Sequence, residues 1–134
     1  LFRSMLVLAS VPACKFSTAN ISSLKLSKDK TAAQETNTFA QPDTFYGVAT
    51  VSNVPDKVKV TGRLIIIDVA GEKAGPIPGL ESVVELAGSG TATFTFSAPS
   101  AGWPKGKYAL EVSMLNDGDE AKDAKKKSAE FTIQ

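Results

Sequence analysis

Short stretches in which polar and apolar residues alternate recur along the chain from residue 21, and this period of two constrains the fold most. The clearest stretch is 91–97, where Ala92, Phe94 and Phe96 alternate with threonines. Such a period places successive side chains on opposite faces of a β-strand. Turn signals rich in Gly, Pro, Asn and Asp separate the stretches. The predicted strands cover residues 21–26, 44–53, 57–69, 80–87, 91–97, 107–116 and 125–133.

The connections between these strands agree with an all-β fold. Residues 27–43 form a long polar connection that is expected to hold one helical turn, and residues 71–79 form a loop with three glycines and two prolines. No long segment has a period of 3.6 residues. About seven short strands with a turn every 8–12 residues are typical of an Ig-like antiparallel β-sandwich. We therefore predict such a sandwich over residues 21–134.

Three large apolar side chains allow two interpretations each. Ile65 and Ile67 fall on the strand face that carries Lys59 and Arg63, and they are either an exposed patch for a partner or part of a bulge or covered strand end. The covering element would be the loop of residues 71–79. Trp103 is either packed in the core or a binding anchor. We take Ile65, Ile67 and Trp103 as candidate partner-binding residues.

The sequence Gly106-Lys107-Tyr108 opens the sixth predicted strand. In Ig-like sandwiches, a tyrosine near the start of this strand donates a hydrogen bond back to the upstream backbone. The glycine supplies the close approach that this corner needs. The motif predicts a structural role for Tyr108.

The N-terminal residues have the layout of an export signal. Residues 1–13 carry one charge, Arg3, followed by an apolar run that is too short to span a membrane. Val11-Pro12-Ala13-Cys14 resembles the lipobox of bacterial lipoproteins, in which the cysteine receives lipid. Residues 1–13 are then a signal peptide, and residues 14–20 are the lipidated Cys14 with a short tether. The alternatives are a plain cleaved signal, a buried cysteine or an uncleaved N-terminal strand.

The stretch of residues 89–114 resembles the bacterial Ig-like modules of cell-envelope lipoproteins. The residues that carry the resemblance are a glycine turn, an alternating Phe strand, a Gly-Trp-Pro corner and a Gly-x-Tyr strand, namely Gly90, Phe94, Phe96, Gly102, Trp103, Pro104, Gly106 and Tyr108. Residues 44–55 also resemble the second strand and turn of these modules. The resemblance implies the fold and an exported, membrane-anchored location in a bacterial cell envelope. It implies no functional residue.

Charge and residue counts exclude several function classes. Lys and Arg number 15 and Asp and Glu number 14, so the net charge of +1 argues against a nucleic-acid binder. The chain contains no histidine, which removes the usual general base and the Cys/His type of zinc site. One cysteine allows no internal disulfide. We predict no catalytic residue, no cofactor and no metal site, and hence no enzyme.

The remaining polar candidates are weak. Ser22 and Lys25 are spaced for a helix, whereas this segment is a predicted strand. Three carboxylates are predicted on outward strand faces, and four oxygen-bearing residues of one hairpin are a possible Ca²⁺ site. A lysine cluster indicates a protected edge strand or a weak contact with anionic lipid. The carboxylates are Glu81, Glu85 and Glu111; the hairpin residues are Asn116, Asp117, Asp119 and Glu120; and the lysines are Lys122, Lys125, Lys126 and Lys127.

Two hypotheses about function follow. The first is a non-catalytic, lipid-anchored interaction module of the cell envelope that binds an unknown envelope protein or polymer. The alternative is a module that binds a small molecule, a carbohydrate through Trp103, Tyr46 and Tyr108, or Ca²⁺. A carbohydrate site of this kind requires at least one exposed aromatic ring.

Overall fold

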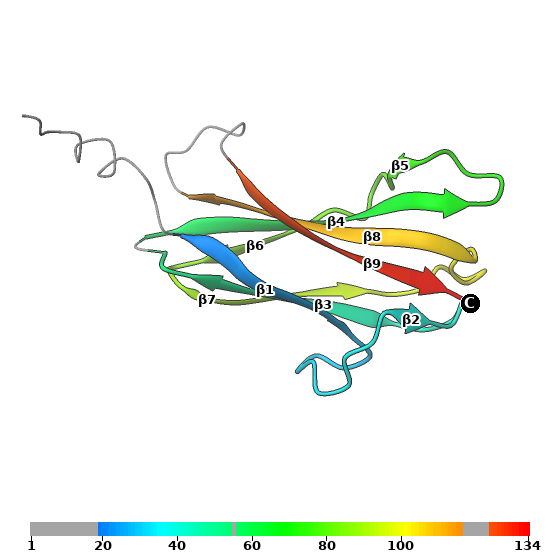
Figure 1. The fold of residues 1–134 in the computed structure, drawn as a ribbon, viewed down its shortest axis with the longest axis horizontal. Helices are drawn as coiled ribbons and strands as arrows, with labels where there is room; N and C mark the ends of the chain where they lie inside the picture. The colour runs from blue at the N-terminus through cyan, green and yellow to red at the C-terminus, as the bar shows by residue number, and fades with distance from the viewer. Residues whose placement is uncertain (1–18, 55, 117–123) are drawn as a thin grey trace, which may run out of the picture.

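Two β-sheets packed face to face form the structure, a computed structural model that describes residues 19–54, 56–116 and 124–134 (Figure 1). The smaller sheet has the order β1-β3-β7, and the larger has the order β2-β9-β8-β4-β5, with β6 also paired to β4. The strands are β1 (Asn20–Ser27), β2 (Thr38–Phe39), β3 (Phe45–Ser52), β4 (Val58–Val69), β5 (Gly75–Pro76), β6 (Ser82–Leu86), β7 (Gly90–Phe96), β8 (Gly106–Asn116) and β9 (Lys125–Ile133). The described residues contain no helix.

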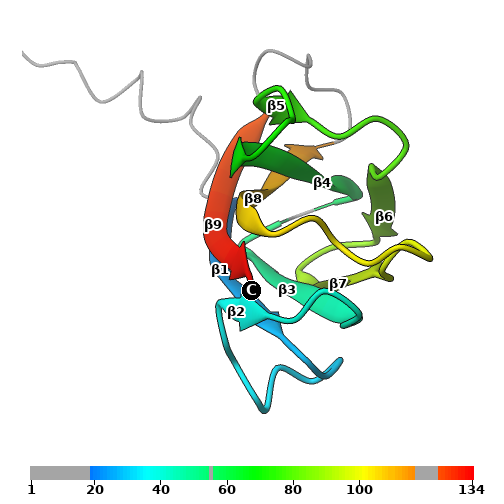
Figure 2. The same ribbon diagram turned by 90° about the vertical axis from the view of Figure 1, so that its right-hand side faces the viewer.

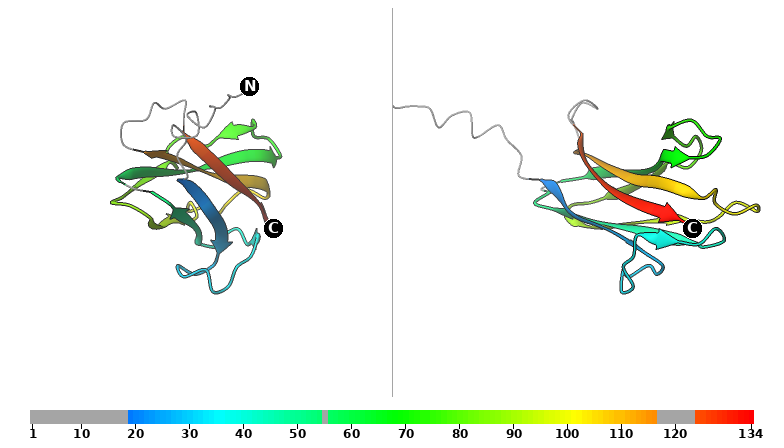
Figure 3. Two further views of the ribbon diagram at one scale, coloured as in Figure 1. Left: turned by 60° about the vertical axis from the view of Figure 1, so that its left-hand side comes forward. Right: turned by 45° about the vertical axis from the view of Figure 1, so that its right-hand side comes forward.

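The predicted all-β sandwich is confirmed, and each of the seven predicted strands is present with boundaries shifted by no more than two residues. The prediction of a helical turn within residues 27–43 is wrong, because these residues contain no helix. A hydrogen-bonded turn around Asp29 and the short strand β2 occupy this connection, which projects from the side of the smaller sheet (Figure 3). The sandwich also begins earlier than predicted, because Ala19 is buried and Asn20 pairs with Ser52.

The two sheets face each other in the end-on view (Figure 2), and the buried apolar side chains form one core cluster between them. Alternation along β4, β7 and β8 directs one row of side chains inward from each strand. Gly62 interrupts the inward row of β4, and a Cβ atom there would lie 2.9 Å from the ring of Phe94. The missing side chain therefore lets the Phe94 ring approach the β4 backbone. The inward rows are Val58, Val60 and Leu64; Ala92, Phe94 and Phe96; and Tyr108, Leu110, Val112 and Met114.

An aromatic cluster joins the two sheets near one end of the sandwich. The ring centroid of Phe45 lies 4.7 Å from that of Phe39, 4.9 Å from that of Phe131 and 5.4 Å from those of Phe96 and Trp103. Buried aromatic pairs at such distances stabilise a core beyond the area that they bury. The cluster brings together β2, β3, β7, β9 and the connection after β7.

Tyr108 forms the predicted corner. Its hydroxyl donates a hydrogen bond to the backbone oxygen of Pro104 at 2.6 Å, and its side chain is buried. Burial raises the pKa of the Tyr108 phenol, and the negative charge of Glu72 adds to this effect. Gly106 has a φ of +148°, and a Cβ atom there would lie 2.5 Å from the backbone oxygen of Asp68. The close approach of the two backbones therefore requires glycine, as the motif predicts.

The lysines at the start of β9 lie at a sheet edge. β9 pairs with β8 along its length, whereas β2 covers its other side only at Thr132 and Ile133. Lys125, Lys126 and Lys127 are exposed there, as expected of an edge strand protected by lysines, while Lys122 of the same predicted cluster lies outside the described residues. The Lys125 ammonium donates a hydrogen bond to the backbone oxygen of Ala19. The start of β9 therefore lies beside the first described residue of the sandwich.

Replacing Tyr108 by phenylalanine removes the corner hydrogen bond and leaves the rest of the ring in place. Because the Pro104 oxygen loses its partner, we expect Tyr108→Phe to lower the free energy of unfolding by about 1–2 kcal/mol. Urea denaturation measures this change. Tyr46→Phe is the matched control, because Tyr46 is half-buried on β3 outside the core and should lose much less. Equal losses in the two variants would show that the corner bond does not stabilise the fold.

Candidate functional site

The outer face of the larger sheet carries rows of side chains that cross its strands. β6, β4, β8 and β9 lie in that order, so residues that pair across them stand side by side. One row across the sheet consists of Val83, Thr61, Ser113 and Lys126. The row on one side of it contains the pair Glu85–Lys59, and the row on the other side contains the pair Arg63–Glu111. Since the side chains of one face are about 7 Å apart along a strand, neighbouring rows form a continuous surface.

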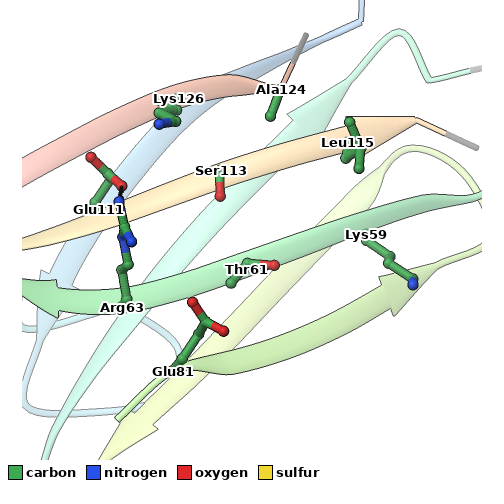
Figure 4. A pocket seen from close by; sticks show the side chains of 9 residues that line it. All are labelled: Lys59, Thr61, Arg63, Glu81, Glu111, Ser113, Leu115, Ala124 and Lys126. Carbon is green, nitrogen blue, oxygen red and sulfur yellow. Dashed lines mark hydrogen bonds and ion pairs between the residues drawn. The ribbon is translucent and has the colours of Figure 1, made fainter. Parts of the chain in front are cut away.

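A shallow hollow of about 290 Å³ opens on this face (Figure 4). Its middle consists of two short hydroxyl side chains, Thr61 and Ser113, which pair directly across β4 and β8. Longer side chains surround them on neighbouring strands, and the difference in length creates the depression. The lining residues are Lys59, Thr61, Arg63, Glu81, Glu111, Ser113, Leu115, Ala124 and Lys126.

An ion pair forms one wall of the hollow. Nε and Nη2 of Arg63 lie 2.8 Å and 2.7 Å from the same carboxylate oxygen, Oε1 of Glu111. The two side chains are partly exposed, at 35% and 21%. Because solvent screens such a pair, it contributes at most about 1 kcal/mol to stability. Its main consequence is that the guanidinium group is held across the strands, as Figure 4 shows.

The hollow offers hydrogen-bonding groups of several kinds to a ligand. Thr61 and Ser113 supply hydroxyls, Glu81 supplies a carboxylate, and Lys59 and Lys126 supply ammonium groups that have no ion pair within the described residues. None of the lining side chains is aromatic. Val83, which is 54% exposed, adds an apolar group beside Thr61. The arrangement suits a partner rich in hydroxyl or charged groups better than a flat apolar one.

Sequence alternation predicts the outward orientation of these residues but does not bring them together. Glu81 and Glu111 are predicted to face outward, and both line the hollow. Thr61 and Ser113 are not recognisable as neighbours from the sequence, because their pairing depends on the register of β4 against β8. Only that register, which is set by the whole sandwich, identifies them. Local sequence therefore predicts which side chains face outward but not which of them become neighbours.

Trp103 is not available as a binding anchor, which corrects the partner-binding prediction for this residue. Its side chain is only 3% exposed and packs in the aromatic cluster. Its indole Nε1 donates a hydrogen bond to the backbone oxygen of Asp43 at 2.8 Å. The core interpretation of Trp103 is confirmed. Tyr108 is equally buried, so neither ring can serve as the exposed platform of the carbohydrate hypothesis.

Ile65 and Ile67 lie where the covered strand end was expected. The register of β4 against β8 shifts between Ile66 and Asp68, and β5 pairs with β4 at Ile65 and Ile66. Ile65 is partly buried, while Ile67 at the shift is 37% exposed. Both features of the bulge and loop interpretation are therefore present. Ile67 therefore exposes only a small apolar surface, and neither isoleucine lines the hollow.

Other predicted residues fall partly outside the described ranges. Cys14, residues 1–13 and most of the tether lie outside them, as do Asp117, Asp119 and Glu120 of the predicted Ca²⁺ hairpin and Lys122. Within the described ranges, no three His, Cys, Asp or Glu side chains are grouped so that they could hold a metal ion. The same ranges contain no helix that is long and apolar enough to cross a membrane.

Comparison with known proteins supports the fold. No family model matches the sequence, and no curated protein is significantly similar to it. Among solved structures, the chain is similar to β-glucosidase from Listeria innocua in complex with gluconolactone (TM-score 0.51, 16% identity), with glucose (0.51, 13%) and, as a mutant, with laminaribiose (0.52, 14%). The alignments cover 86–87% of this chain.

The same alignments cover only 15–16% of the β-glucosidase chains, so this chain spans about one seventh of their length. At such low identity the likeness shows the fold alone. It is consistent with a β-sandwich that also occurs as one part of a much larger protein. Fold by itself does not determine activity.

Asp29 is the carboxylate whose environment is most unusual, and its role is structural. The carboxylate accepts hydrogen bonds from the hydroxyls of Ser27 at 2.6 Å and Thr31 at 2.5 Å, and from the backbone N–H groups of Ala33 and Gln34. These bonds, with Ser27 first, hold the pKa of Asp29 well below its usual range. Its partners are the last residue of β1 and residues of the turn that follows. Asp29 therefore closes this turn.

The Asp29 turn should make stability depend on pH in a defined direction. The folded protein holds the Asp29 proton less tightly than the unfolded chain, so the carboxylate stabilises the fold above an unfolded pKa of about 4. This contribution is lost progressively as the pH falls below that value. We expect Asp29→Asn to unfold at lower urea concentration than the native chain at pH 6, with a smaller difference at pH 2.5. Glu130→Gln, at an exposed position on β9, controls for the loss of one charge. A difference that stays constant with pH would contradict this role.

Proposed function

We propose that this chain is a non-catalytic, lipid-anchored interaction module of a bacterial cell envelope that binds a protein or polymer partner through the outer face of its larger sheet. The observation that carries the proposal is the hollow on that face, which combines two hydroxyls and the ammonium groups of Lys59 and Lys126 with the exposed Val83 beside it. Exposed groups of mixed character on a rigid sheet are suited to recognition.

The position of the hollow agrees with an anchor at Cys14. Ala19, the first described residue, contacts Lys125 at the start of β9. Ala124, just before β9, and Lys126 within it line the hollow. Ala19 is the fifth residue after Cys14, and five extended residue steps span at most about 18 Å. A lipid on Cys14 would therefore keep the hollow near the membrane surface, where an envelope partner can reach it.

The resemblance of residues 89–114 to cell-envelope Ig-like modules and the lipobox-like Cys14 support the location. The absence of histidine from the whole sequence supports the non-catalytic part, since it removes the most common acid–base residue. The corner residues of the resemblance, Gly106 and Tyr108, have the positions that such a module requires.

A photo-reactive residue at position 113, introduced into the full chain in cells, tests the proposed surface. We expect it to cross-link one specific partner, whereas the same group at Lys25, on the smaller sheet, should not. Adding Lys59→Glu and Lys126→Glu should lower the cross-linked yield at least about ten-fold, because the two positive charges of the hollow become negative. Lys25→Glu is the matched control. No specific product from position 113 would overturn the proposed surface.

The same cells test the anchor independently. Cys14→Ser should move the chain from the membrane fraction to the soluble fraction, because acyl chains provide the stable attachment. Equal distribution of the native chain and the variant would refute lipidation and leave the sheet surface as a separate question.

A second candidate function is carbohydrate binding in the hollow. The observation that favours it is the hydroxyl pair of Thr61 and Ser113 beside the Glu81 carboxylate, since sugars are bound through arrays of such groups. The β-glucosidases of similar fold are known in complex with glucose and with laminaribiose, so a sandwich of this kind occurs within a carbohydrate-active protein. The lack of an aromatic ring in the lining predicts weak binding.

Thermal denaturation with a panel of soluble sugars and Ca²⁺ tests this alternative. A ligand at about 100 times its Kd adds about 2.7 kcal/mol to stability and raises the melting temperature. We expect Thr61→Val, which replaces a hydroxyl by a methyl group, to reduce a sugar-induced shift. Thr44→Val, at an exposed position just before β3 and outside the hollow, should leave it unchanged. The absence of any shift across the panel would count against a carbohydrate site.

A further inference from the structure

β7 is an edge strand of the smaller sheet and has no strand partner on its outer side within the described residues. It pairs with β3 over seven consecutive residue pairs, from Phe45–Phe96 to Val51–Gly90, without a register shift. Its sequence, Gly-Thr-Ala-Thr-Phe-Thr-Phe, contains no charge and no proline. A regular, uncharged edge of this length presents backbone N–H and C=O groups to another strand.

The other edges of the sandwich carry features that oppose pairing. β1 has a register shift between Ile21 and Ser23 and an exposed Lys25, and the part of β9 that does not pair with β2 carries three exposed lysines. β2 and β5 have two residues each, and β6 is five residues long with the exposed Glu85. Bulges, charges and short length are the usual protections of edge strands. β7 has none of them.

The core fixes β7 in an orientation suited to pairing. Ala92, Phe94 and Phe96 are buried between the sheets, so the strand is held in a regular extended form. Thr91, Thr93 and Thr95 point to the opposite face and are exposed. Threonines are favoured in strands, and threonine pairs are among the favourable neighbours across antiparallel strands.

We propose that β7 pairs antiparallel with β7 of a second copy of this chain, which joins two three-stranded sheets into one continuous sheet. A two-fold axis at Thr93, the middle residue of β7, places Thr93 opposite the partner's Thr93 and Thr91 opposite the partner's Thr95. Two copies of β7 can pair without repulsion because the strand contains no charged residue. This inference does not depend on the proposed function, since the hollow lies on the outer face of the other sheet.

The chemistry of β7 favours a second copy over an unrelated extended segment. Antiparallel self-pairing brings every threonine of one strand opposite a threonine of the other, and each exposed side chain gains a suitable neighbour. Stable interfaces bury about 1,200–2,000 Å², and a pair of seven-residue strands buries less. The dimer is therefore expected to form at protein concentrations on the order of 100 µM, and to be favoured where chains are concentrated on a membrane.

Sedimentation equilibrium of the full chain carrying Cys14→Ser tests the proposal, because this variant has no thiol. We expect concentration-dependent dimers that Thr93→Lys weakens at least about ten-fold, since two like charges then meet at the two-fold axis. Ser128→Lys, an equal charge change at an exposed position on β9, should leave the dimer intact. Mixing Thr93→Lys with Thr93→Glu should restore association as a heterodimer, because opposite charges then face each other.

A covalent test complements the charge series. Thr93→Cys in the Cys14→Ser chain should form a disulfide-linked dimer on mild oxidation, whereas Ser128→Cys should not, because only residues opposite each other across strands lie within reach. Thermal denaturation checks that each variant is folded. A native chain that is monomeric at about 500 µM would overturn the proposal. So would a dimer that Thr93→Lys leaves unchanged, or a mixture of the Lys and Glu variants that stays monomeric.

Discussion

The ring of Phe45 lies at the centre of the aromatic cluster that joins the two sheets. It is fully buried at the start of β3 and contacts Phe39, Phe96, Phe131 and Trp103, which come from separate parts of the chain. The Tyr108 corner lies in the same region, because its ring stacks on Phe131 at a centroid distance of 5.4 Å. Since large aromatic side chains dominate core energetics, this cluster fixes how the smaller sheet lies against the larger one.

The outer surfaces depend on that packing through strand register. Slipping β4 by one residue against β8 would turn Val60 and Leu64 outward and bury Lys59 and Arg63, at a high cost for the charged groups. The inner apolar row therefore sets which outer side chains meet. Thr61 lies opposite Ser113, and Arg63 opposite Glu111, as a consequence of core packing. Core packing therefore holds the residues of the hollow side by side.

Most of the strands and their inward faces are predictable from the sequence because both depend on local alternation. The corner at Tyr108 is also predictable, since a short motif carries it. The turn around Asp29 is not, because its hydrogen bonds join residues whose spacing also suits a helical turn. The place of Trp103 cannot be settled from sequence, since a corner position permits both burial and exposure. Neighbours in the hollow such as Arg63 and Glu111 are 48 residues apart in the sequence, and only tertiary structure brings them together.

The outer face of the larger sheet and the edge at β7 place different demands on the sandwich. A binding face needs side chains that vary without disturbing the backbone, and the outer face meets this need because its strands are paired on both sides over much of β4 and β8. An edge offers backbone groups, so its specificity depends on which charges are absent as much as on which side chains are present. In this chain charged residues protect β9 and β6, while β7 carries threonines alone on its exposed face. Because the hollow and the β7 edge belong to different sheets, the binding proposed for the face and the pairing proposed for the edge do not exclude each other.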